Sequence, residues 1–323
     1  RRGRPATLRA RRRRGPLRSA LASVLVFGTG ALATFLGGRL SRAGHDVTLA
    51  GTWAAALAAI ARDGLRVEEA DGSFTATARV HDLASRPDPA SADFVLVLVK
   101  AHRTASVAPA AAAAARGGGP ATLQNGLGNR EALEEAAGPG RVLVGATTAG
   151  ATLLGPGRVR GHVAETVVGE TRDGRAGALA ALLQGAGLPA RLAPDVDRLL
   201  WSKLAANCAI NPLTALHGVS NGALLERPEW RSTMAAAAAE VAAVAAARGL
   251  RIPEPAELAF DVARATAGNR SSMLQDVERG AATEIDALSG AVVREGRRLG
   301  VPTPVNAALL EAVREHEAAA APR

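Results

Sequence analysis

The sequence predicts an α/β protein of two domains: a doubly wound α/β domain over residues 22–193 and an all-α domain over residues 194–318. The length of 323 residues exceeds the size at which a single hydrophobic core usually stops growing. Short apolar runs alternate with helical or glycine-rich segments as far as Ala193, which is typical of βαβ units and a parallel sheet. From Pro194 onward, long stretches rich in alanine, leucine and arginine have helical spacing.

The first strand–turn–helix unit is the clearest in the sequence. Val24–Phe27 is an apolar run of strand length, and a glycine-rich turn follows it. A helix is expected to begin near Ala31 and to end by Gly44, where His45–Leu49 begins a second strand. Three later apolar runs are expected to form strands, and one longer segment is expected to form a hairpin. The strands are Asp93–Val99, Ala121–Gln124 and Val142–Ala146, and the hairpin is Gly155–Glu170.

In the C-terminal half, prolines and glycines mark the expected ends of the helices. These residues are Pro212, Gly249, Pro302 and Pro304. Two alanine-rich segments, 110–115 and 235–247, are interpreted as parts of helices and not as interaction motifs.

The net charge of +9 comes from the beginning of the chain. Nine arginines and no acid lie within residues 1–18, and the remaining 30 basic residues balance the 30 acidic ones. We therefore expect a disordered basic tail over residues 1–21 and no nucleic-acid partner, because proteins that bind nucleic acid usually carry a basic patch on the folded surface.

The basic tail and the uncharged residues 19–38 together resemble a secretory signal. Four glycines interrupt this stretch, however, and its apolar run is too short to cross a membrane.

The single cysteine, Cys208, excludes an intrachain disulfide and fits a reducing compartment. The six histidines form no cluster with the spacing of metal ligands. The sequence therefore predicts a cytoplasmic protein without a metal and without a membrane partner.

The residues after the first strand fit the dinucleotide fingerprint G-x-G-x-x-G/A, in the strand–turn–helix context that this fingerprint requires. The motif consists of Gly28, Thr29, Gly30, Ala31, Leu32 and Ala33. Gly28 permits the tight turn, Gly30 lets the backbone approach a pyrophosphate, and the small Ala33 lets the helix pack closely on the strand. The free N–H groups of the helix N-terminus then bind the phosphates. These residues predict a Rossmann domain.

The end of the second strand normally carries the residue that distinguishes NAD from NADP. An acid binds the 2′-hydroxyl of NAD, and a basic residue accepts the 2′-phosphate of NADP. Residues 50–53 of this chain contain neither. The missing acid disfavours NAD, whereas NADP depends on Thr52 and on Arg62. We predict NADP(H), with NAD as the alternative.

Lysine is rare in this chain. Lys100 and Lys203 are the only lysines among 39 basic residues, and the chain has no tyrosine. In a sequence so biased toward arginine, a lysine is expected where its chemistry is needed. A desolvated lysine can release a proton near neutral pH, and an arginine cannot.

Lys203 lies in an otherwise apolar stretch that also carries two amides. Lys203 and Asn207 are four residues apart and so share a helix face, and Asn211 extends the series. Pro212 is expected to place Asn211 at a break in the helix. Buried polar groups need a ligand or a partner, so this series favours ligand binding over a network of caps and core amides. Cys208 is interpreted as a buried, inert thiol.

A third polar group covers residues 269–276 and 283–286. Taken alone, it is interpreted as a helix cap and a solvated helix face.

From about Val24 to Glu315, the sequence resembles the ketopantoate reductases, or 2-dehydropantoate 2-reductases. The resemblance rests on a series of short motifs in the same order along the chain. They are Gly28–Ala33, Val99–Ala101, Leu123–Gly126, Trp201–Thr214, Ser220–Gly222, Ser271–Asp276 with Thr283–Asp286, and Gly300–Pro304.

The resemblance implies NADPH-dependent reduction of 2-dehydropantoate to (R)-pantoate, a step of pantothenate and coenzyme A synthesis, with Lys203 as the general acid. The residues that it implies for the substrate are Asn125, Asn207, Asn211, Asn221 and Ser272, with Asn269 as a further candidate. Those that it implies for the cofactor, besides the glycine motif, are Lys100, Asn125, Ala151 and Glu284. The chemistry agrees, because hydride addition to a ketone leaves a charge on oxygen that an acid and amide donors must neutralise.

Two alternatives remain open at this point. The chain is a reductase or dehydrogenase of another 2-keto or 2-hydroxy acid, or it is a non-catalytic NADP(H)-binding regulator. In each case the ligand site is expected between the two domains. The sequence allows a homodimer without specifying one.

Overall fold

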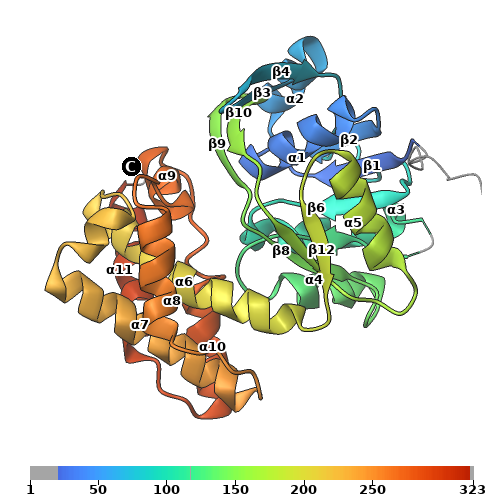
Figure 1. Ribbon diagram of the computed structural model, residues 1–323. Coiled ribbons are helices and arrows are strands. Elements are labelled where there is room, and N and C mark those ends of the chain that lie inside the picture. The colour runs from blue at the N-terminus through green and yellow to red at the C-terminus, as the bar shows by residue number, and fades with distance from the viewer. Residues whose placement is uncertain (1–20, 117, 321–323) are drawn as a thin grey trace, which may run out of the picture.

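The computed structural model describes residues 21–116 and 118–320. Its N-terminal part contains an eight-stranded sheet, and Figure 1 shows this sheet with helices packed around it. Across the sheet, the strands are β12 (Ala190–Ala193), β11 (Thr166–Gly169), β8 (Leu143–Thr147), β7 (Ala121–Thr122), β6 (Phe94–Val97), β1 (Ser23–Phe27), β2 (Asp46–Gly51) and β5 (Arg79–Asp82). Neighbouring strands from β8 to β5 are parallel, whereas β11 is antiparallel to β8 and parallel to β12. The chain winds outward from β1 in both directions, so the predicted doubly wound domain is confirmed.

Helices cover both faces of this sheet. They are α1 (Ala31–Arg42), α2 (Ala54–Asp63), α3 (Thr104–Ala114), α4 (Asn129–Ala137) and α5 (Arg175–Gly185), and a short 3₁₀ turn, η1 (Ala101–Arg103), precedes α3. Alternate side chains of β1 point to opposite faces. Val24 and Val26 join a core with α1, α2 and α5, whereas Leu25 and Phe27 join a core with α3 and α4.

A second, four-stranded sheet lies beside α1 and was not predicted. Its strands, in order, are β4 (Gly72–Ala76), β3 (Leu65–Glu69), β10 (Arg158–His162) and β9 (Gly150–Gly155). The hairpin expected over 155–170 is wrong in its bounds, because the chain turns at Gly157 (φ 67°) and the hairpin is β9–β10. The residues of β11, expected in that hairpin, are all buried and pair with β8 in the main sheet instead.

The C-terminal half is helical, as predicted. Its elements are α6 (Val196–His217), η2 (Gly222–Leu225), α7 (Pro228–Ala247), α8 (Pro255–Ala265), α9 (Ser272–Glu278), α10 (Ser289–Leu299) and α11 (Pro304–Ala320). A separate apolar core holds these helices together. Figure 1 shows α6 running from beside the main sheet into the helical domain.

The expected break at Pro212 is wrong, because α6 continues through this residue. Proline removes one backbone donor and crowds the carbonyl four residues earlier. The Thr214 hydroxyl donates to two carbonyl oxygens of the same turn, at 2.9 and 3.1 Å. Residues 208–215 are buried in the helical core, so packing outweighs the local cost of the proline.

The main sheet and the helical domain meet at a short connection. β12 ends at Ala193, and the Asp195 side chain caps α6 by accepting the N–H of Arg198. The boundary between 193 and 194 stays a prediction, and the basic tail lies outside the described residues apart from Leu21. Within the described ranges, no helix is both long enough and apolar enough to cross a bilayer.

Candidate active site

The glycine turn after β1 leaves room for a ligand in front of α1. Gly28 has φ 132°, and a Cβ atom there would lie 2.9 Å from the Leu98 carbonyl oxygen. Gly30 has an ordinary φ of −81°, and a Cβ atom there would meet nothing within 4 Å. Gly28 is therefore required by the backbone itself, whereas Gly30 keeps open the space beside the turn.

The N-terminus of α1 has the properties of a phosphate site. Gly30 is the N-cap, no side chain caps the first turn, and that turn contains no acid. The first N–H groups of a helix lack partners within the helix and carry a partial positive charge. Together with the open space at Gly30, these groups fit the pyrophosphate of a dinucleotide.

The end of β2 lies beside this turn. The Gly28 N–H donates to the Ala50 carbonyl at 2.8 Å, and Thr52 follows β2 as an exposed residue. The role expected for Arg62 stays a prediction. This residue lies in the last turn of α2, about 12 Å along the helix axis from Ala54, and its guanidinium is paired with Asp63 at 2.8 Å. Thr52 is left as the polar side chain between β2 and α2.

Lys203 extends from α6 to the end of strand β8. Its Nζ donates to the carbonyl oxygen of Thr147 at 2.6 Å, and the side chain is partly buried. Burial lowers the pKa of Lys203 to about 8. The negative charge of Glu284 has the opposite, smaller effect and raises this pKa. The main sheet and the helical domain thus meet at an ammonium group that can lose its proton near neutral pH.

Asn207 and Asn211 follow Lys203 on the same face of α6. Because α6 is continuous, the three side chains are spaced one helical turn apart. Within the described part of the chain, neither amide side chain forms a hydrogen bond. Cys208, between them in sequence, is fully buried, and burial raises the pKa of its thiol to about 12. The thiol therefore remains protonated, in agreement with the prediction of an inert cysteine.

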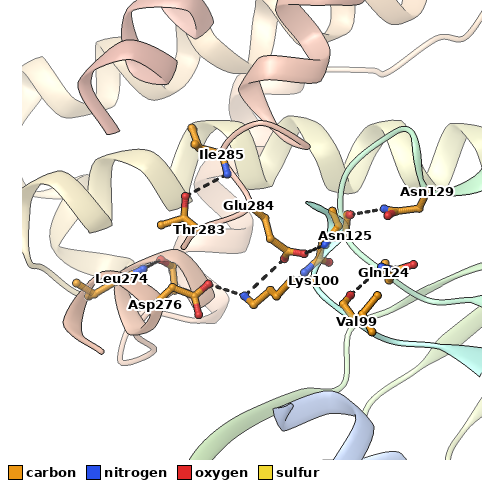
Figure 2. A network of polar contacts seen from close by, with 12 residues as sticks. Val99, Lys100, Gln124, Asn125, Asn129, Leu274, Asp276, Thr283, Glu284 and Ile285 are labelled. Atoms are coloured by element: carbon orange, nitrogen blue, oxygen red, sulfur yellow. Dashed lines mark hydrogen bonds and ion pairs between the residues drawn. The ribbon is translucent and has the colours of Figure 1, made fainter. Parts of the chain in front are cut away.

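A network of charged groups joins the main sheet to the helical domain (Figure 2). Lys100 Nζ, just after β6, lies 2.5 Å from Asp276 Oδ2 and 3.9 Å from Glu284 Oε2. The other Glu284 oxygen accepts the Ala101 N–H at 3.0 Å, and Asp276 also pairs with Arg279 at 2.8 Å. Asp276 was not among the predicted site residues. Its signal in the sequence was its position on the same short polar stretch as Ser272.

Buried amides hold the segment after β7. Gln124 Nε2 donates to the Val99 carbonyl at 2.7 Å, and Asn129 Nδ2 donates to the Asn125 carbonyl at 2.9 Å (Figure 2). These bonds place Asn125 beside the segment that carries Lys100. The Asn125 side chain itself forms no hydrogen bond with the described residues, so its amide is available to a ligand.

The same segment contacts the helical domain through its backbone. A Cβ atom on Gly126 (φ 79°) would lie 2.5 Å from the Ala287 carbonyl oxygen, and the Leu127 N–H donates to this oxygen at 3.0 Å. The glycine therefore permits the close approach of the two domains on one side of the site.

Ser272 and Asn221 belong to a further group at the other end of α6. Ser272 is exposed at the start of α9, and its neighbour Ser271 caps that helix and forms a hydrogen bond of 2.7 Å with the Thr214 hydroxyl. Asn221 is buried, its Nδ2 donates to Thr266 at 2.8 Å, and its Oδ1 has no partner among the described residues. An unpaired buried oxygen of this kind calls for a donor from a ligand or from water.

Two further predicted residues are not part of the charged network. Ala151 is in β9 and packs against the core on the α1 side of the sheet. Asn269 is exposed and holds the Asn221 backbone, because its carbonyl accepts the Asn221 N–H at 3.0 Å. The structure thus brings Lys100, Asn125 and Glu284 together and links Lys203 to them electrostatically. Among the described residues, no side-chain hydrogen bond or ion pair joins Ala151 to that group.

Fold and site together define a two-domain oxidoreductase that uses a nicotinamide dinucleotide. The family model described as ketopantoate reductase PanE/ApbA matches residues 24–173, and the model of the C-terminal part of the same family matches residues 195–317. The chain therefore belongs to the ketopantoate reductase family.

Individual relatives agree with this assignment. The chain is 40% identical to the 2-dehydropantoate 2-reductase of Halobacterium salinarum, over 90% of this chain and 97% of that protein. A solved ketopantoate reductase of the PanE/ApbA family from Ralstonia eutropha is 34% identical, with a TM-score of 0.83 over 92% of this chain and 99% of that one. A D-mandelate dehydrogenase solved with NADH and anilino(oxo)acetate has a TM-score of 0.86, and at 24% identity it shows a shared fold alone.

Proposed function

We propose that the protein reduces 2-dehydropantoate to (R)-pantoate with NADPH, and that Lys203 is the general acid. The observation that carries the proposal is the setting of Lys203, which is partly buried, bonded to the Thr147 carbonyl at 2.6 Å, and shifted by burial to a pKa of about 8. A group with this pKa holds a proton at neutral pH and can transfer it to a developing alkoxide.

The chain has to stabilise negative charge on the ketone oxygen when bound NADPH supplies hydride to the ketone carbon. The Lys203 ammonium supplies both a positive charge and a proton at this oxygen. The Thr147 carbonyl accepts one of the three ammonium N–H groups and so fixes the direction of the other two. Asn207, one turn further along α6, adds a neutral amide donor.

The remaining polar groups fit the rest of the substrate. We assign Ser272 to the carboxylate and Asn211 and Asn221 to the other oxygens. 2-Dehydropantoate carries a terminal hydroxyl group, which can donate to the unpaired Oδ1 of Asn221. Asn125, whose amide is not engaged by the described residues, is assigned to both substrate and nicotinamide ribose.

The cofactor assignments rest on the glycine turn and on the charged network. Gly28–Ala33 would hold the pyrophosphate, and Lys100, Ala151 and Glu284 would complete the site. Because residues 50–53 carry no acid, nothing in this segment repels a 2′-phosphate, so we propose NADPH over NADH. We further propose that the reaction serves pantothenate and coenzyme A synthesis in the cytoplasm, without a nucleic-acid partner.

The proposed function is tested by following NADPH and NADH consumption with the purified protein and a panel of 2-keto acids that includes 2-dehydropantoate. We expect the highest kcat/KM with 2-dehydropantoate and NADPH. A higher kcat/KM with another 2-keto acid would mean that the protein is a reductase with a different substrate. Tight NADPH binding without turnover of any acid would instead indicate a non-catalytic regulator.

The lowered pKa of Lys203 predicts a pH dependence. The acid must be protonated to act, so kcat/KM should fall as the pH rises through about 8. The Glu284 charge raises the pKa of Lys203, so Glu284→Gln should move this fall to lower pH. The measurement is the pH profile of kcat/KM for both proteins at saturating NADPH. A wild-type profile that stays flat well above pH 8 would contradict the assigned acid.

A further inference from the structure

Trp53 is a large apolar side chain left exposed next to the phosphate turn. It is 39% exposed, and in the described part of the chain only Leu21 and Leu192 are comparable large apolar side chains with such exposure. It stands two residues after the end of β2, at the N-cap of α2. An exposed indole costs solvation free energy unless something covers it when the protein is at work.

The sheet order places this residue on the adenosine side of the dinucleotide site. β1, which leads into the phosphate turn, has β2 and β5 on one side and β6 and β7 on the other. The segments after β6 and β7 carry Lys100 and Asn125, and we assign Asn125 to the nicotinamide ribose. The adenosine half is then left to the segment after β2, whose Ala50 carbonyl is bonded to the Gly28 N–H at 2.8 Å.

The surroundings of Trp53 leave the indole free for a ligand. Ala54 and Ala55, in the first turn of α2, are small and exposed. The other two tryptophans differ, because Trp201 is buried and Trp230 stacks on His217 with ring centroids 4.6 Å apart. No ring or cation contact of this type involves Trp53 among the described residues.

Charged groups near the end of β2 offer little to an adenosine moiety. Asp82, opposite Gly51 on β5, accepts the Ala84 N–H at 2.9 Å and the Ser85 hydroxyl at 2.9 Å. These hydrogen bonds lower the pKa of Asp82, with a smaller contribution from the positive charge of Arg86. The carboxylate is thus occupied locally, and Arg86 partly offsets its charge.

We propose that Trp53 stacks on the adenine ring of the bound cofactor and supplies the main contact to the adenosine half. The inference rests on the proposed use of NADPH. An indole face attracts a purine through stacking, which needs no charge and no hydrogen bond on the base. Stacking is common to NADPH and NADH, so Trp53 contributes affinity for both, and selectivity between them rests on the neighbouring residues.

The test compares Trp53→Ala and Trp53→Phe with the wild type and with Trp230→Phe, a matched control in the helical domain. Binding of NADPH, 5′-ADP and reduced nicotinamide mononucleotide is measured by titration calorimetry, and quenching of tryptophan fluorescence by 5′-ADP is recorded. Loss of one base–aromatic stack should weaken 5′-ADP and NADPH binding by about tenfold in Trp53→Ala. Trp53→Phe should restore most of the affinity, because it keeps an aromatic face.

Two further readouts separate stacking from a structural role. Reduced nicotinamide mononucleotide lacks adenosine, so its affinity should be the same in all four proteins. Quenching by 5′-ADP should disappear in both Trp53 variants and persist in Trp230→Phe. If Trp53→Ala bound 5′-ADP and NADPH as tightly as the wild type, the proposed stacking would be wrong, whereas the proposed function would stand. A wild-type protein that binds no NADPH would overturn both.

Discussion

Lys203→Ala should lower kcat by about 10²–10⁴-fold, the range usually lost with a general acid. The residue is the only charged side chain that α6 presents with Asn207 and Asn211, and its Nζ is fixed on the Thr147 carbonyl at 2.6 Å. Without it, the developing alkoxide has neither a proton donor nor a neighbouring positive charge. The measurement is steady-state NADPH oxidation with 2-dehydropantoate, together with the NADPH dissociation constant.

Two matched variants separate the roles of the charge and the proton. Lys203→Arg keeps a positive charge but cannot release a proton near neutral pH, so it should recover little activity. Ser202→Ala changes the neighbouring residue, whose hydroxyl donates to the Arg198 carbonyl of its own helix, and should retain wild-type turnover. NADPH affinity should change little in all three variants. Wild-type turnover in Lys203→Ala would mean that another group is the acid.

Gly30→Ala should weaken NADPH binding by about 10–100-fold while changing the free energy of unfolding by less than about 1 kcal/mol. The backbone at Gly30 has φ −81°, which alanine adopts easily, and a Cβ atom there would meet nothing within 4 Å. The added methyl group therefore fits the folded protein. It occupies the space through which a pyrophosphate must approach the N–H groups of α1.

Gly28→Ala is the contrasting variant at the same turn. Gly28 has a φ of 132°, which glycine adopts readily and other residues rarely adopt. The Cβ atom of an alanine there would lie 2.9 Å from the Leu98 carbonyl oxygen. The backbone strain alone costs about 1–3 kcal/mol, so we expect a lowered melting temperature as well as lost binding. Thermal unfolding and NADPH titration of both variants check the pair. Equal NADPH affinity in Gly30→Ala and the wild type would contradict the phosphate site.

The correct predictions from the sequence concern features with a strong local signal. Val24–Phe27 is confirmed as part of β1, and α1 begins directly after the glycine turn, as predicted. The signal is strong because a strand buried on both faces requires apolar residues and a φ of 132° requires glycine at Gly28. The helical C-terminal half was equally clear. The rarity of lysine in an arginine-rich chain indicates Lys203 as a candidate, and the structure places its Nζ beside the last residue of β8, Thr147.

The wrong predictions concern residues whose local preference is opposed by packing. Pro212 should end a helix by its own geometry, but it is buried in a core that keeps α6 continuous. The Gly155–Glu170 hairpin failed because β11 pairs with β8, which lies nearly twenty residues earlier in the chain.

The sequence by itself determined the first strand–turn–helix unit, the helical character of the C-terminal half, and the types of side chain available for chemistry. These depend on short-range patterns of apolar residues, glycines and charges. Tertiary structure alone decided that Asp276 pairs with Lys100 at 2.5 Å, that the Thr147 carbonyl holds Lys203, and that burial lowers the pKa of this lysine to about 8. These properties arise between residues far apart in the chain, and desolvation depends on what surrounds a group in space.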